Sequence, residues 1–212
     1  MTCNQCQGIE QEFNRKHALE QLYQYRKKGA SATTRQLITA LTTGDVNGLT
    51  LLDIGGGVGA IQLALLKAGV SRAVDVDASP AYLEVASQEA KRQGFIERVN
   101  YYQGDFVELA PTISPADIVT LDRVICCYDD MLALVSLSAQ RARRIYGLVY
   151  PRDTWWVRLL LPVMNLYLRL QRSSFRVFAH PTLAVDAIVR AQGFTQRFYR
   201  EMGFWQVVVY TL

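Results

Sequence analysis

The 212-residue chain lacks a large excess of charge of either sign. It carries 23 lysines and arginines against 19 acidic residues, a net charge of +4, which is too small to indicate a nucleic-acid-binding surface. Internal repeats and low-complexity tracts are also missing, which excludes a repeat architecture. Half of the residues are hydrophobic and 20% are charged, as is typical of a folded globular domain. We therefore expect one domain with additional helices and no nucleic-acid partner.

The chain also lacks a long uninterrupted apolar run and a secretion signal. Residues 155–170 come nearest to a membrane span, but two arginines, a proline and an asparagine interrupt them, and a span needs about 20 apolar residues. The first residues contain no basic segment followed by an apolar stretch. These absences predict a cytoplasmic protein without an integral membrane segment.

Cysteine is scarce and falls in two pairs, Cys3 with Cys6 and Cys126 with Cys127. Because the adjacent pair is difficult to bridge, reduced thiols are the simpler assignment. The spacing of Cys3 and Cys6 provides only two of the four ligands of a structural zinc site. We therefore predict no metal.

Short apolar runs alternate with helical stretches from residue 49 onward, which predicts a parallel sheet covered by helices on both faces. Two final strands, at residues 194–200 and 205–210, are separated by four residues, too few for a parallel crossover. The other expected strands are at residues 49–54, 73–76, 99–103, 116–121 and 145–150. The predicted fold is thus an α/β three-layer sandwich with a mostly parallel seven-stranded sheet and an antiparallel C-terminal strand.

Helices are expected before the sheet, at residues 9–28 and 33–41, with a break at Gly29. We interpret residues 1–48 as a helical lid over the carboxyl ends of the strands. Residues 49–212 form the ligand-binding domain, with a helical cap at about 152–180.

A glycine-rich turn follows the first strand, where Asp53 precedes Gly55, Gly56, Gly57 and Gly59. Glycine lets the backbone approach a ligand closely, and the helix that follows presents unpaired N–H groups. A buried Asp53 needs partners, so we expect its side chain to bind turn amides or the ammonium group of a ligand. A tight turn without a ligand is the alternative.

The turn also matches the dinucleotide pattern G-x-G-x-x-A through Gly55, Gly57 and Ala60, which leaves NAD open. Asp77, at the end of the second strand, is placed to hold a ribose in either ligand, or is a turn carboxylate. Residues 104–106 are Gly-Asp-Phe, and Asp105 with the following phenylalanine suits adenine. This segment has no counterpart in the dinucleotide fingerprint, although Asp105 is equally suited to cap a helix.

In this order, residues 51–59, 75–80, 104–106 and 117–123 resemble the class I S-adenosylmethionine-dependent methyltransferase family, whose fold is Rossmann-like. The reversed last strand also fits, and the resemblance covers residues 49–212. It implies S-adenosylmethionine as the cofactor. By position, Gly55 and Gly57 meet its methionine part, Asp77 and Ala78 its ribose, Asp105 and Phe106 its adenine, and Asp122 and Arg123 border it after the fourth strand.

More distantly, the chain resembles magnesium-protoporphyrin O-methyltransferases, which have a His-Tyr pair where this chain has Cys126, Cys127 and Tyr128. Tyr128 and His180 are the candidates for orienting an acceptor or taking its proton. A packing role for the tyrosine and a turn or capping role for the histidine are the alternatives.

The predicted function is methyl transfer to a small-molecule acceptor. The alternative functions are an NAD-dependent oxidoreductase and a non-catalytic S-adenosylmethionine-binding module. The sequence does not indicate the oligomeric state.

Overall fold

The predicted alternation of strands and helices is realised in the computed structural model, which describes residues 8, 12–171 and 173–212. The described strands are β1 Thr50–Ile54, β2 Arg72–Asp77, β3 Val99–Gln103, β4 Ala116–Asp122, β5 Ala142–Pro151, β6 Thr195–Met202 and β7 Trp205–Thr211. The described α-helices are α2 Arg15–Lys28, α3 Ala32–Leu41, α4 Ala60–Lys67, α5 Pro80–Arg92, α6 Phe106–Leu109, α7 Met131–Arg141, α8 Trp155–Leu170 and α9 Thr182–Ala191. Cys3, Cys6 and the start of the first predicted helix lie outside the described residues.

The sheet has the strand order β3-β2-β1-β4-β5-β7-β6. Strands β1 to β5 pair in parallel, whereas β7 is antiparallel to both β5 and β6. Only Gly203 and Phe204 separate β6 from β7, and Gly203 has a φ of 61°, a conformation that suits glycine in a tight hairpin. The predicted α/β fold with its antiparallel C-terminal strand is therefore confirmed.

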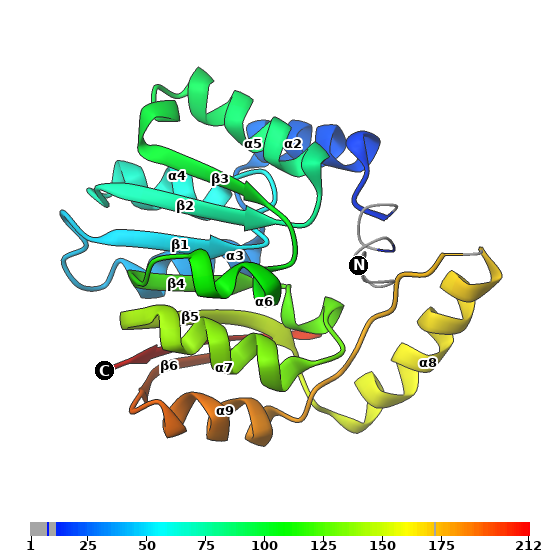
Figure 1. Cartoon of the computed structure of the whole chain (residues 1–212). Helices are drawn as coiled ribbons and strands as arrows, with labels where there is room; N and C mark the ends of the chain where they lie inside the picture. Colours follow the sequence, from blue (N-terminus) through cyan, green and yellow to red (C-terminus); the bar gives the residue numbers. More distant parts are fainter. Residues whose placement is uncertain (1–7, 9–11, 172) are drawn as a thin grey trace.

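Two apolar layers hold helices on the two faces of the sheet. Helices α6, α7 and α9 cover one face, and α3 and α4 cover the other (Figure 1). Parallel strands buried on both faces are rich in apolar residues, and the inner strands β1, β4 and β5 are mostly buried here. The carboxyl ends of β1 to β5 lie at one edge of this sandwich, where polar side chains are free to face a ligand.

The two N-terminal helices occupy different places, although the sequence suggests a common lid. Helix α3 belongs to the helical layer, since Leu37 and Leu41 enter the core next to Gly147 of β5. A Cβ atom at Gly147 would lie 2.9 Å from Leu37 Cδ1, so the glycine allows this close approach. Helix α2 instead packs against α5.

Helix α8 lies beyond the carboxyl ends of the strands and stands apart from the sheet (Figure 1). Its buried residues are Val157 and Leu161. The following segment returns along the same edge to α9, and Phe175 packs edge-to-face against Phe13. Among the described helices, none combines the length and the apolar character that crossing a membrane requires.

Candidate functional site

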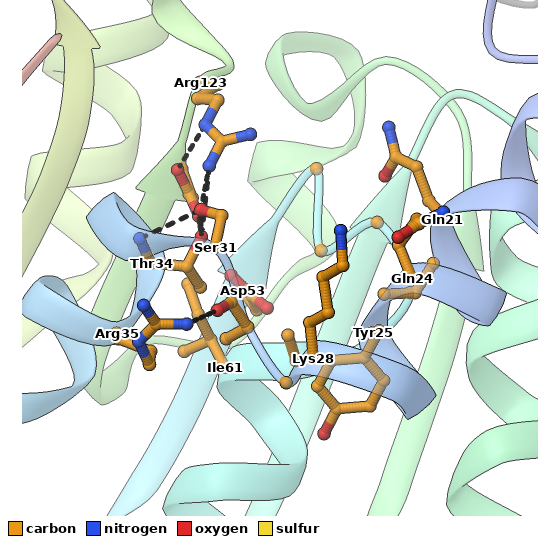
Figure 2. A pocket seen from close by; sticks show the side chains of 18 of the residues that line it. Gln21, Gln24, Tyr25, Lys28, Ser31, Thr34, Arg35, Asp53, Ile61 and Arg123 are labelled. Carbon is orange, nitrogen blue, oxygen red and sulfur yellow. Dashed lines mark hydrogen bonds and ion pairs between the residues drawn. The ribbon is translucent and has the colours of Figure 1, made fainter.

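Two cavities open at the carboxyl edge of the sheet, and both are lined by Gly55, Gly57, Asp122 and Arg123. The first has a volume of about 470 Å³ and lies between the glycine turn, α2 and the start of α3. Figure 2 shows its polar lining, with the side chains of α2 on one side and Arg123 above α3 on the other. The second has a volume of about 550 Å³ and extends from the end of β2 to α8.

The glycine turn leaves no room for a side chain at two positions, Gly55 and Gly56. A Cβ atom at Gly55, whose φ is 65°, would lie 2.5 Å from Val124 Cγ2. At Gly56, a Cβ atom would lie 2.2 Å from Gln62 Nε2. Gly59 precedes α4 in the left-handed conformation and is not among the described residues that line either cavity. The turn therefore exposes backbone to the cavities, as the sequence predicts for a ligand-binding loop.

Asp53 lies beneath the turn, with 1% of its surface exposed. Its Oδ1 accepts a hydrogen bond from Thr120 Oγ1 at 2.6 Å, and its Oδ2 accepts one from Gln62 Nε2 at 3.3 Å. These partners differ from the turn amides that we expect from the sequence, because Thr120 is the register partner of Asp53 on β4. Burial raises the pKa of the Asp53 carboxyl to about 7, although both hydrogen bonds lower it.

Asp77 takes the role toward the turn that the sequence suggests for Asp53. Its Oδ2 accepts the N–H of Gly57 at 3.3 Å, and its Oδ1 accepts the N–H of Ser79 at 2.8 Å. Burial raises the pKa of Asp77 to about 6. Asp77 and Ala78 line the second cavity, so the carboxylate is a turn residue and also faces the space that a ligand would fill.

Asp105 and Tyr128 meet in the second cavity. The Tyr128 hydroxyl donates to Asp105 Oδ2 at 2.8 Å, while Asp105 Oδ1 caps α6 by accepting the N–H of Val107 at 2.9 Å. Phe106 lines the same cavity and is buried in the core. The capping alternative for Asp105 is therefore realised, and the carboxylate still faces the cavity.

The side chains of Asp122 and Arg123, at the end of β4, form hydrogen bonds with residues at the start of α3. Asp122 Oδ2 accepts a hydrogen bond from Thr34 Oγ1 at 2.5 Å, and Asp122 Oδ1 lies 3.5 Å from Arg123 Nε. The Arg123 guanidinium donates to Ser31 and Thr33 and lies over the ring of Trp205. Arg123 has a φ of 65° and is the one non-glycine residue in the described part of the chain with a positive φ, a strained conformation of the kind often found at ligand sites.

His180 lies behind Tyr128 and is not among the described residues that line either cavity. Its Nε2 donates to the backbone carbonyl of Tyr128 at 2.9 Å, and its ring stacks on Phe178. Burial lowers the pKa of His180, which favours the neutral ring. The structure therefore brings Tyr128 to the cavity and places His180 where it supports the Tyr128 backbone.

Comparisons with known proteins agree with this geometry. Residues 52–144 match the family model described as a methyltransferase domain. Over these residues the chain is similar to methyltransferases, and its sheet has the class I methyltransferase fold.

The matched region corresponds to part of longer proteins among the relatives of this chain. Ribosomal protein L11 methyltransferase of Yersinia pseudotuberculosis is 30% identical over 109 residues, which cover 51% of this chain and 36% of that protein. The corresponding protein of Alteromonas mediterranea is 32% identical over 123 residues, which cover 55% and 42%. The chain thus spans well under half the length of these relatives.

Solved structures share the fold over a longer stretch. Magnesium protoporphyrin IX methyltransferase from Synechocystis PCC 6803 with bound SAM aligns with a TM-score of 0.73 and 16% identity, covering 99% of this chain and 98% of that one. An O-methyltransferase family 2 protein from Planctomyces limnophilus in complex with apigenin has a TM-score of 0.69 and 17% identity, over 93% and 61%.

The topology of the sheet also separates this chain from dinucleotide-binding folds. Those folds have the strand order 3-2-1-4-5-6 in an open, mostly parallel sheet, whereas this sheet inserts the reversed β7 between β5 and β6. The glycine pattern shared with NAD sites is therefore local to the turn, and the NAD-dependent alternative is not favoured.

Several residues of the candidate site are not predicted from the sequence. Asp75 is fully buried, and nearby Asp77 and Asp53 add to the burial that raises the pKa of Asp75. Gln62 reaches back from α4 to Asp53, and nothing in its helical context marks that contact. Other apolar side chains that line the second cavity come from distant segments, among them Phe13, Met164, Phe175, Phe204 and Trp205.

Two neighbouring thiols complete the wall of the second cavity. The sulfur atoms of Cys126 and Cys127 lie 3.8 Å apart, and both thiols lie within hydrogen-bond distance of the Arg123 carbonyl. Within the described residues, no cluster of three or more His, Cys, Asp or Glu side chains is arranged to hold a metal ion.

Proposed function

We propose that this chain is an S-adenosylmethionine-dependent methyltransferase that acts on a small, largely apolar acceptor. The observation that carries the proposal is that two cavities share the glycine turn. One cavity has polar walls suited to an amino acid, and the other continues from the ribose and adenine positions to an apolar chamber. A cofactor lying across the turn would present its methyl group to that chamber.

The residues of the chain fit the cofactor in chemical type. Asp53 and Asp122 lie beside the first cavity and suit an ammonium group. Asp77 suits the hydroxyls of a ribose, and Asp105 and Phe106 suit an adenine ring. The glycine turn supports the same placement, because a Cβ atom at Gly55 would fill the space between the turn and Val124.

The bound cofactor supplies a methyl group on a sulfonium, from which transfer is already favourable. The main task of the protein is therefore to align the acceptor and to exclude water. Tyr128 is held by Asp105 and by its backbone bond to His180, so its hydroxyl has a fixed position from which to orient an acceptor. We propose Tyr128 as the acceptor-contacting residue and His180 as a positioning residue.

The acceptor chamber favours an apolar ligand, because side chains of α8 and of the β6–β7 turn line it, among them Leu160, Met164 and Phe204. We propose that residues 152–180 act as a cap over this chamber. A small net charge supports the absence of a nucleic-acid partner. The sulfur atoms of Cys126 and Cys127, 3.8 Å apart and not bonded to each other, support a cytoplasmic location.

The test is methyl transfer from labelled S-adenosylmethionine to a panel of porphyrins, phenols and aromatic amines, with Tyr128→Phe as the comparison. We expect a product with at least one apolar acceptor and slower turnover in the variant. Cofactor binding without product across the whole panel would favour a non-catalytic binding module. If the chain methylated proteins and none of these small molecules, the small-molecule assignment would be wrong.

A further inference from the structure

Helix α8 carries a continuous apolar stripe on its outer face. The stripe consists of Trp155, Leu159, Val163, Leu166 and Leu170, which are exposed by 74%, 65%, 64%, 57% and 76%. The spacing i, i+4, i+8, i+11 and i+15 places these side chains within about 80° of one another around the helix. Five large apolar side chains in one row exceed the scattered exposure that is normal on a protein surface.

The charge of α8 has one sign. Its sequence contains Arg158 and Arg169 and no acidic residue, and Arg158 pairs at 2.6 Å with Asp153, which precedes the helix. Residues 152–176 carry five arginines against this one carboxylate, so the segment keeps a positive net charge. At about 100° per residue, both arginines of α8 fall on the same flank of the stripe, about 40° to 60° from Trp155. An apolar face with an aromatic residue at one end and arginines along its border is the pattern of a helix that lies in the interface of an anionic bilayer.

Two other occupants fit the helix less well. A second copy packed antiparallel on the same stripe would bring two arginine-rich segments together, in each of which Asp153 is the one carboxylate among residues 152–176 and already pairs with Arg158. A membrane-spanning position is also disfavoured, because 16 residues extend over only about 24 Å and include Pro162.

The stripe adjoins the opening of the acceptor chamber. Leu160 and Met164 lie on the neighbouring flank of α8, away from the arginines, and line the 550 Å³ cavity. Leu183, at the start of α9, is 84% exposed and adds apolar surface near the same edge of the fold. A surface that contacts the stripe would therefore lie at the mouth of this cavity.

We propose that α8 docks on the surface of an anionic lipid bilayer through this stripe. Docking brings the mouth of the cavity to the membrane, so that an apolar acceptor can enter from the lipid phase. This last step rests on the proposed methyltransferase function, whereas the docking itself does not.

The experiment is co-sedimentation of the full chain with vesicles of phosphatidylcholine alone and with vesicles that also contain phosphatidylglycerol. We expect binding to the anionic vesicles, weakened by salt, and at least about tenfold weaker binding for Leu159→Glu/Leu166→Glu. Leu212→Glu is the matched control, since Leu212 is 62% exposed at the opposite end of the sheet (Figure 1). The control binds like the unmodified chain.

Cofactor titration on the same samples separates this proposal from the proposed function. Absence of vesicle binding, or equal binding by the double variant, overturns the docking proposal while cofactor binding stays intact. A dimer in sedimentation velocity that the double variant abolishes also overturns it, because a second copy then covers the stripe. Vesicle binding without cofactor binding supports docking and contradicts the proposed function.

Discussion

Replacing Asp53 with asparagine tests the buried carboxylate beneath the glycine turn. Burial raises the pKa of Asp53 from 3.8 to about 7 in the folded chain. Between these values the folded state retains a proton that the unfolded chain has released, so the free energy of unfolding falls as the pH rises. The contribution of Asp53 to stability is therefore complete below its unfolded pKa and is lost as the pH rises through about 7.

The size of the expected change in stability follows from the pKa shift of Asp53. A difference of about 3 pKa units at ~1.36 kcal/mol per unit corresponds to about 4 kcal/mol. Asp53→Asn keeps the shape of the side chain and an acceptor for Thr120 but removes the charge. We expect the variant to become more stable relative to the unmodified chain, by up to about 4 kcal/mol, between about pH 4.5 and pH 8.

Urea unfolding across this pH range measures the difference directly. Asp117→Asn is a suitable control, because hydrogen bonds from Thr50 lower the pKa of Asp117, so its contribution is constant above about pH 5. Stability curves of the chain and of Asp53→Asn that stay parallel from acid to neutral pH would refute the assignment of a raised pKa.

Three further predictions concern the cofactor and acceptor sites. Asp77→Ala weakens S-adenosylmethionine binding by about 1–3 kcal/mol in calorimetry, because charge-assisted hydrogen bonds to the ribose are lost; unchanged affinity in a folded variant contradicts the ribose assignment. Gly56→Ala abolishes measurable cofactor binding, since its Cβ would lie 2.2 Å from Gln62 Nε2, and retained affinity in equilibrium dialysis would show that the turn tolerates a side chain. Tyr128→Phe lowers kcat with a cofactor Kd within about threefold of the unmodified chain, because the hydroxyl faces the acceptor; a loss confined to cofactor affinity assigns Tyr128 to the adenine site through Asp105.

The fold follows from the sequence because its patterns are local. Alternating apolar runs and helices predict the parallel sheet, and the short link before Trp205 forces the final strand to reverse. The glycine turn and Asp77 are likewise marked by short motifs, and the structure places both at the cavities.

Other features depend on contacts between distant segments. Asp53 is hydrogen-bonded to Thr120 because β1 and β4 are neighbours in the sheet. No local sequence pattern predicts this strand pairing. Helix α3 joins the sheet layer because the missing side chain of Gly147 leaves space for Leu37, while the start of α3 borders the first cavity. His180 has the residue type of a catalytic base, but its bond to the Tyr128 carbonyl places it behind the cavity wall.

Titration of S-adenosylmethionine and S-adenosylhomocysteine into the purified chain, with NAD as the control, tests whether the chain binds S-adenosylmethionine as its cofactor. We expect saturable binding of both sulfur ligands at one site and no binding of NAD. Tight binding of NAD with no binding of either sulfur ligand would contradict it.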